Sequence, residues 1–238
     1  MLIVDTFTAP ARALADVATS RRFVPALLAA TVVALLHAGA LASRLDVETL
    51  LEQQLAAVAA AAPEQSAAMT PHEREEALAS KRKLATVGIV VGGLFGPALQ
   101  ALGAALALWL AFKVAALAAG FRATFAVVSY GFLPLALAKL LSIPSLLARS
   151  VVTPDGAARL LPSNLGALMP AVAHPAWRGL LTSIDVFSLW SLALVTIGLA
   201  AVTGASWRRA GLVAGVMWLA YVAVFGVALA AIAARATP

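Results

Sequence analysis

Five long apolar segments are separated by charged or proline-rich stretches along this chain. Each segment contains about 20 or more residues, the length of α-helix that crosses the ~30 Å hydrocarbon core of a bilayer. The segments are continuously apolar and rich in Ala and Leu, whereas a strand of a membrane barrel is shorter and alternates apolar with polar residues. The pattern therefore predicts an all-α, polytopic membrane helix bundle. The five predicted spans are approximately residues 23–42, 84–112, 123–143, 180–203 and 210–233.

The polar stretch between the first two spans has the pattern of two helices. Residues 43–62 place apolar side chains three or four positions apart, which is typical of an amphipathic helix, and Pro63 ends it. Thr70 then offers an N-cap hydroxyl, followed by a proline and, three residues after the cap, by Glu73. No helix-breaking residue follows before Gly88, so we expect this second helix to continue into the second span. The two helices are predicted to form an extramembrane hairpin.

A shorter helix is predicted before the first span, at residues 9–19. Pro10 suits its first turn, and Leu14 and Val17 fall on one face. We expect this helix to lie in the membrane interface.

Composition supports the membrane assignment and bounds the chemistry. The chain is 62% hydrophobic and only 12% charged, whereas soluble domains have roughly 45–50% apolar and about 25% charged residues. No flexible linker divides the sequence, so residues 1–238 are predicted to form a single domain. The chain contains no cysteine, which excludes disulfides, thiolate metal sites and cysteine nucleophiles within it.

The formal net charge of +6 comes from basic residues that lie mostly beside the apolar segments. Such residues anchor helices to lipid headgroups and are attracted to anionic lipid. Membrane lipids are therefore the predicted partners, and the sequence lacks the basic stripe with interleaved aromatics that indicates nucleic-acid binding. The flanking basic residues are Arg21, Arg22, Lys81, Arg82, Lys83, Lys113, Arg122, Arg208 and Arg209.

Two charged residues inside the predicted spans are candidates for function, because a charge at mid-bilayer costs ~2.5–3.5 kcal/mol on insertion scales. Asp185 follows Thr182 and Ser183, so a helix-start role is one interpretation and a functional carboxylate is the other. Lys139 can extend its ammonium to the interface, or face Asp185 if the third and fourth spans are neighbours. The second arrangement is typical of a small transporter or channel component, although the residues indicate no particular solute.

Glycines and prolines indicate where helices approach closely or bend. Gly88, Gly92 and Gly96 recur on nearly one face of the second span, and Gly211 with Gly215 repeats the spacing in the fifth. Small residues at this spacing let helix backbones pack closely in lipid, either within one chain or between copies. Pro97 and Pro134 predict kinks, and the sequence from Gly131 to Pro134 predicts a hinge or break in the third span.

No motif for catalysis or cofactor binding was found. The three histidines, His37, His72 and His174, are scattered, and neither a serine elbow nor a phosphate-binding glycine loop occurs. The chain is therefore not predicted to be an enzyme, and no cofactor or metal is expected.

Several short motifs resemble those of one membrane protein family. The fourth span opens with an Asp-x-Phe-x-x-Trp pattern formed by Asp185, Phe187 and Trp190, followed by Ile197-Gly198 and a basic turn. Residues 9–14 and residues 120–125, the latter leading into Tyr130 and Pro134, look similar as well. Together these segments resemble the Yip1 domain family in its bacterial branch.

The resemblance implies a five-helix integral membrane protein with a cytoplasmic N-terminus and without catalytic activity. Eukaryotic members act in vesicle traffic and associate with small GTPases and with one another. This chain has a short N-terminal tail and no Asp-Leu-Tyr-Gly-Pro motif, so a GTPase partner is not expected. A non-catalytic scaffold or accessory subunit is the predicted function. It would bind a membrane protein partner through the hairpin around residues 44–83 or through the glycine faces, or associate with itself, in a bacterial cytoplasmic membrane. The numbers of basic residues on the two sides do not support this orientation by themselves, although their density does.

Overall fold

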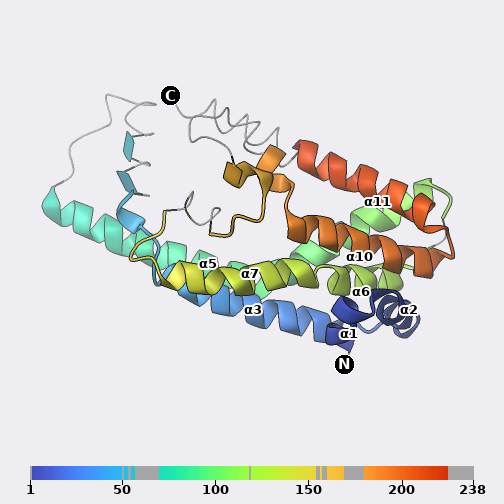
Figure 1. Cartoon of the computed structure of the whole chain (residues 1–238). Coiled ribbons are helices and arrows are strands. Elements are labelled where there is room, and N and C mark those ends of the chain that lie inside the picture. Colours follow the sequence, from blue (N-terminus) through green and yellow to red (C-terminus); the bar gives the residue numbers. More distant parts are fainter. Residues whose placement is uncertain are drawn as a thin grey trace.

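In the computed structural model the long helices lie side by side along one axis, and the short helix α2 (Pro10–Ser20) lies across one end of them (Figure 1). The structure describes residues 2–49, 51–52, 55–56, 70–117, 119–153, 156, 160–168 and 180–224. Within these ranges, extended pairing is limited to two isolated bridges, Leu45 with Val152 and Asn164 with Asp185. The all-α prediction is confirmed for this part of the chain.

The long helices run in alternating directions through the bundle (Figure 1). Among the described residues, four helical segments are long and apolar enough to cross a membrane: α3 (Val24–Ala42), α5 (Pro71–Val114), the pair α6–α7 over Phe121–Leu147, and α10 (Val186–Thr203). The start of α3, the end of α5, the start of α6 and the end of α10 lie at one end of the bundle, which we call the α2 end because α2 (Pro10–Ser20) lies there (Figure 1).

The fifth predicted span is described in part. Gly204 ends α10 in the left-handed conformation, and the Ser206 hydroxyl accepts a hydrogen bond from the Arg209 amide at the start of α11 (Trp207–Tyr221). The predicted span continues to residue 233, beyond the described residues. A count of five spans therefore stays a prediction.

The third span is interrupted where the sequence predicts a hinge. A single residue, Phe132, separates α6 (Phe121–Gly131) from α7 (Leu133–Leu147). The ψ angle of Phe132 is near 1°, which is outside the helical range. Pro134 occupies the first turn of α7, where its missing N–H removes a hydrogen bond from the preceding turn. The predicted break is confirmed.

Helix α5 is the longest element, with 44 residues, or about 66 Å at 1.5 Å per residue. Its start is the predicted capping box: the Thr70 hydroxyl accepts from the Glu73 amide at 3.3 Å, and the Glu73 carboxylate accepts from the Thr70 amide at 2.7 Å. The helix continues without a break through Pro97. The prediction that the capped helix runs directly into the second span is confirmed.

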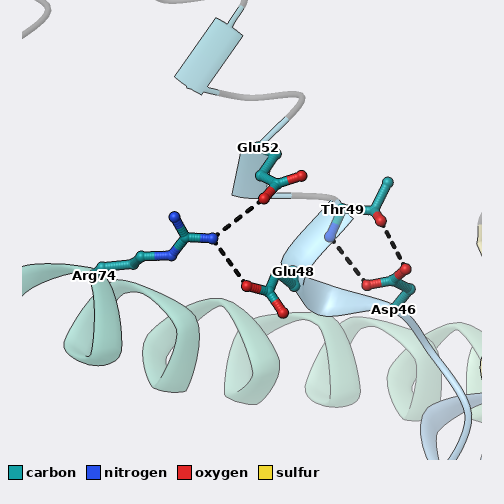
Figure 2. A network of polar contacts seen from close by, with 5 residues as sticks. All are labelled: Asp46, Glu48, Thr49, Glu52 and Arg74. Carbon is teal, nitrogen blue, oxygen red and sulfur yellow. Dashed lines mark hydrogen bonds and ion pairs between the residues drawn. The ribbon is translucent and has the colours of Figure 1, made fainter. Parts of the chain in front are cut away.

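The first helix of the predicted hairpin is described only at residues 43–49, 51–52 and 55–56. Figure 2 shows how it contacts α5: Arg74 forms ion pairs with Glu48 at 2.9 Å and with Glu52 at 3.2 Å. The Asp46 carboxylate accepts hydrogen bonds from the Thr49 hydroxyl at 2.6 Å and the Thr49 amide at 3.0 Å (Figure 2). The placement of this hairpin outside the membrane stays a prediction.

The same Thr49 hydrogen bonds lower the pKa of Asp46, the side-chain bond being the larger cause. Because they favour the ionised carboxylate, they stabilise the segment above the carboxylate's ordinary pKa, and this contribution is lost as the pH falls through the lowered value.

The buried core lies where the N-terminal helices meet α6 and α10. Leu14 and Val17 of α2 are fully buried, as their shared face predicts, and α2 packs against both α6 and α10. Helix α1 (Leu2–Thr8) precedes α2, and the ring of its Phe7 contacts Trp190 of α10 edge-on, with ring centroids 5.4 Å apart. The N-terminal helices are therefore packed onto the bundle.

On α3 the small residues are buried and many of the large apolar residues are exposed, which is the reverse of a helix in a soluble bundle. The buried residues of α3 are Ala26, Ala34 and Ala38, while Leu28 and Leu36 on the same helix are 61% and 57% exposed. Large exposed aliphatic side chains also line α5. Such a surface is stable in lipid, where small residues let helices approach and large ones contact acyl chains.

Candidate functional site

Asp185 lies at the N-cap of α10, not inside the helix. Its carboxylate accepts a hydrogen bond from the Phe187 amide at 2.8 Å, and the Ser188 hydroxyl accepts one from the Asp185 amide at 3.3 Å. The fourth span therefore begins at Val186, and the prediction that one helix runs from residue 180 is wrong. The N-cap geometry explains the interruption, because an N-cap residue has extended rather than helical dihedral angles. The helix-start interpretation of Asp185 agrees with this geometry.

A loop on residues 160–168 packs against this helix start. The Val186 amide donates to the Ser163 carbonyl at 3.1 Å, and the Leu165 amide donates to the Ile184 carbonyl at 3.2 Å. Gly166 lies so close to Thr182 that a Cβ atom there would clash with the threonine methyl group. Asp185 thus caps α10, and the backbone on either side of it pairs with the loop.

Replacing Asp185 with alanine should lower the free energy of unfolding by about 0.5–2 kcal/mol, because α10 loses its N-cap acceptor. Asp185→Asn should be nearly neutral, since asparagine caps helices equally well. Unfolding of the purified protein in detergent, followed by circular dichroism, measures both. Equal losses for the two variants would contradict the capping role.

Phe187 and Trp190 of the same motif contribute packing. Phe187 supplies the amide that the Asp185 carboxylate binds, and Trp190 contacts Phe7 of α1. Both side chains are partly buried. The motif therefore joins the start of α10 to the N-terminal helices.

Tyr130 and Pro134 lie on either side of the break between α6 and α7, and both are buried. The Tyr130 hydroxyl has no hydrogen-bond partner among the described atoms, and neither does the buried Ser191 hydroxyl of α10. Next to Tyr130, Gly131 packs directly against Val195 of α10. This site is a close crossing of α6 and α10 that carries two unpartnered hydroxyls.

The α6–α10 crossing depends on two glycines that do not belong to the four-residue glycine spacing of the second and fifth spans. A Cβ atom on Gly131 would clash with Val195, and one on Gly198 would clash with Val127 of α6. Gly198 belongs to the Ile-Gly pair of the resemblance, and Gly131 to the predicted hinge. Those two signals were present in the sequence, but neither showed which helices meet.

Lys139 lies on α7 and lines a small cavity of about 30 Å³, enough for a water molecule. Gln100 of α5 and Ser129 of α6 line the same cavity. In the described part of the chain, no ion pair joins Lys139 to Asp185. The proposed charge pair is therefore not formed here.

The predicted glycine faces are mostly open. No heavy atom of the described chain lies within 4 Å of a Cβ built on Gly88, Gly92, Gly96 or Gly215. Close contact between α3 and α5 is made instead by Gly93, which faces Ala34 and Ala38. A Cβ atom built on Gly211 would lie 3.3 Å from the Thr196 methyl group. No described helix packs closely against Gly88, Gly92 or Gly96, and the packing role of these glycines stays a prediction. We call these three residues the α5 glycine face.

No group of three or more His, Cys, Asp or Glu side chains that could hold a metal ion occurs in the described ranges.

The described part of the chain has four apolar helical segments, exposed aliphatic surfaces and buried small residues, which together define an integral, multi-pass membrane protein.

The comparison with protein families identifies the family. Residues 4–229 match the Yip1 domain, so the chain belongs to the Yip1 domain family, whose members are generally non-catalytic membrane proteins. The resemblance found in the sequence is confirmed at this level, and the bacterial branch stays a prediction. Searches of curated proteins and of solved structures gave no match.

Proposed function

We propose that this protein is a non-catalytic scaffold or accessory subunit that binds a membrane protein partner through the α5 glycine face. The observation that carries the proposal is that this face is not covered by any described residue, although Gly93 on the same helix packs tightly against α3. Successive glycines on one side of a membrane helix leave a shallow groove that a second helix can fill. Three helices of the same bundle already contact α5, namely α3, α6 and α11.

The N-terminal part of α5 adds a second surface for a partner. Residues 71–83 are polar and precede the apolar part of the helix, and Arg74 ties them to the preceding segment (Figure 2). We infer that this hairpin projects from the membrane. We further propose that the protein lies in a bacterial cytoplasmic membrane with the α2 end on the cytoplasmic side, as the resemblance to the bacterial branch of the family implies.

Bulk added to the α5 glycine face should release the partner. We expect the double variant Gly88→Leu with Gly92→Leu to lose most of the membrane protein recovered with the tagged chain after cross-linking in native membranes. Val90→Phe is the matched control, because Val90 is 41% exposed on another side of α5. Quantitative mass spectrometry measures the recovery. Undiminished recovery with the double variant would contradict the proposal.

The orientation is tested by thiol labelling, because the chain has no cysteine of its own. Glu75→Cys should react with a membrane-impermeant reagent in intact cells, and Arg122→Cys only after permeabilisation. The reverse labelling pattern would place the N-terminus outside.

A small transporter or channel component is the second candidate function. It is favoured by the cavity beside Lys139 and by the unpartnered hydroxyls of Tyr130 and Ser191. Asp185 contributes less to this candidate than the sequence indicated, because its carboxylate caps α10. Flux into liposomes that is lost in Lys139→Met, with folding retained, would favour transport over the scaffold role.

A further inference from the structure

A hollow of about 400 Å³ lies between the turn after α5 and the first two turns of α11. Arg208 and Arg209 line it from the first turn of α11, and Leu212 and Val213 line it one turn further along. Ala115 and Leu117 of the turn after α5 form the other wall. The hollow is therefore basic at the helix start and apolar along the helix.

The positive charge at this hollow is not compensated within the described chain. Neither Arg208 nor Arg209 forms an ion pair with a described residue. Both lie in the first turn of a 15-residue helix, where the helix dipole disfavours cations. Two arginines that oppose the local electrostatic preference indicate that an anion completes the site, since departures from local preference concentrate at functional sites.

The opposite wall is held in an uncommon backbone conformation. Ala116 has a φ of 54°, in the left-handed region that favours glycine. The Leu117 amide donates to the Phe112 carbonyl at 2.8 Å and the Ala116 amide to the Lys113 carbonyl at 3.0 Å, which together close the end of α5. This turn directs Leu117, which is 8% exposed, into the hydrophobic core beside the hollow. These two hydrogen bonds define the backbone path of this wall.

The position of the hollow at the end of the bundle fits a lipid headgroup. It lies at the α2 end of the bundle, where α5 and α10 end and α11 begins (Figure 1). Leu212 is 69% exposed one helical turn closer to the middle of the span, a position suited to an acyl chain. Trp207 is 68% exposed beside Arg208, with the guanidinium carbon 5.6 Å from the ring centroid. Exposed tryptophan and arginine at a span end are typical of the headgroup region.

We propose that this hollow binds an anionic phospholipid of the adjacent leaflet. Arg208 and Arg209 hold the phosphate, for which the guanidinium fork is suited, and the upper part of an acyl chain lies along Leu212 and Val213. The unpaired charge of two arginines makes a lipid with net negative charge preferred over a zwitterionic one. This site is separate from the α5 glycine face and does not depend on the scaffold proposal.

Native mass spectrometry of the full-length protein, titrated with phosphatidylglycerol or phosphatidylcholine, tests the proposal. We expect phosphatidylglycerol to bind more tightly, and Arg208→Gln with Arg209→Gln to weaken it about 30-fold, as expected for the loss of two basic contacts near the membrane surface. The matched control is Arg82→Gln with Lys83→Gln, which removes the same charge near the other end of α5 and should leave the affinity unchanged. Arg208→Lys with Arg209→Lys keeps the positive charge but loses the guanidinium groups. Its affinity for phosphatidylglycerol should fall between that of the unchanged protein and that of the glutamine variant.

Three results would overturn the proposal. Equal weakening in the control would show that diffuse charge attracts the lipid. Equal affinity for the two lipids would show that the arginines do not select an anion. Displacement of the lipid by excess inorganic phosphate would show an anion site that makes no use of the acyl chain. If the glutamine variant does not fold, the lysine variant decides, because unchanged affinity there would contradict the requirement for guanidinium groups.

Discussion

Replacing Leu14 with alanine should detach the N-terminal helices from the bundle, at a cost of about 2–5 kcal/mol in the free energy of unfolding. Leu14 is fully buried, and its helix α2 contacts both α6 and α10. Removing its side chain leaves a cavity at the centre of that contact. We expect faster hydrogen exchange in residues 10–20, measured by mass spectrometry in detergent or in nanodiscs.

Val4→Ala is the matched control for this variant. Val4 lies on α1 and is 62% exposed, so its truncation should change stability by no more than about 0.5 kcal/mol. If Leu14→Ala leaves exchange in α2 unchanged, the helix is not held by this contact. The docking of the N-terminal helices onto α6 and α10 would then be wrong.

Replacing Gly198 with alanine should destabilise the crossing of α6 and α10, although alanine is the better helix former by about 1 kcal/mol. The new Cβ atom would clash with the Val127 side chain, and overpacking of this kind costs about 1–3 kcal/mol. Gly215→Ala gains the same helix propensity without a clash, because the space around Gly215 is open among the described residues. Unfolding in detergent should show Gly198→Ala less stable than Gly215→Ala by about 1–3 kcal/mol.

A second substitution separates a clash from a backbone effect. Val127→Ala removes the methyl groups that the new Cβ atom meets, so the double variant should recover part of the loss, and the two changes should not be additive. Additive losses, or equal stability of Gly198→Ala and Gly215→Ala, would contradict the close crossing of the two helices.

Features that depend on neighbouring residues in the sequence were predicted well. Four candidate spans in the described residues followed from segment length and apolarity, and the start of α5 followed from the spacing of Thr70 and Glu73. Pro134 predicted the break after α6, because a missing N–H acts within one turn. The buried face of α2 followed from the spacing of Leu14 and Val17.

Features that depend on which helices meet were not predictable. Gly88, Gly92 and Gly93 are close in sequence, but only Gly93 faces α3, and periodicity does not show which side of a helix its neighbour occupies. The start of α10 was placed too early because residues 180–184 are as apolar as a span, and the loop that pairs with Ile184 and Val186 is distant in sequence. Lys139 and Asp185 belong to helices that do contact each other, α7 and α10, but the Asp185 carboxylate caps α10 and forms no ion pair with Lys139 in the described ranges.

The most direct test of the scaffold account is site-specific cross-linking from the α5 glycine face. The natural absence of cysteine allows single variants, Gly92→Cys on this face and Val90→Cys on another exposed side of α5. A short thiol-reactive cross-linker is applied in native membranes, and the adducts are identified by mass spectrometry. The account predicts that Gly92→Cys forms a defined adduct with a different membrane protein and that Val90→Cys does not. Adducts of the same kind and yield from both positions, or from Gly92→Cys only with other copies of this chain, would contradict it.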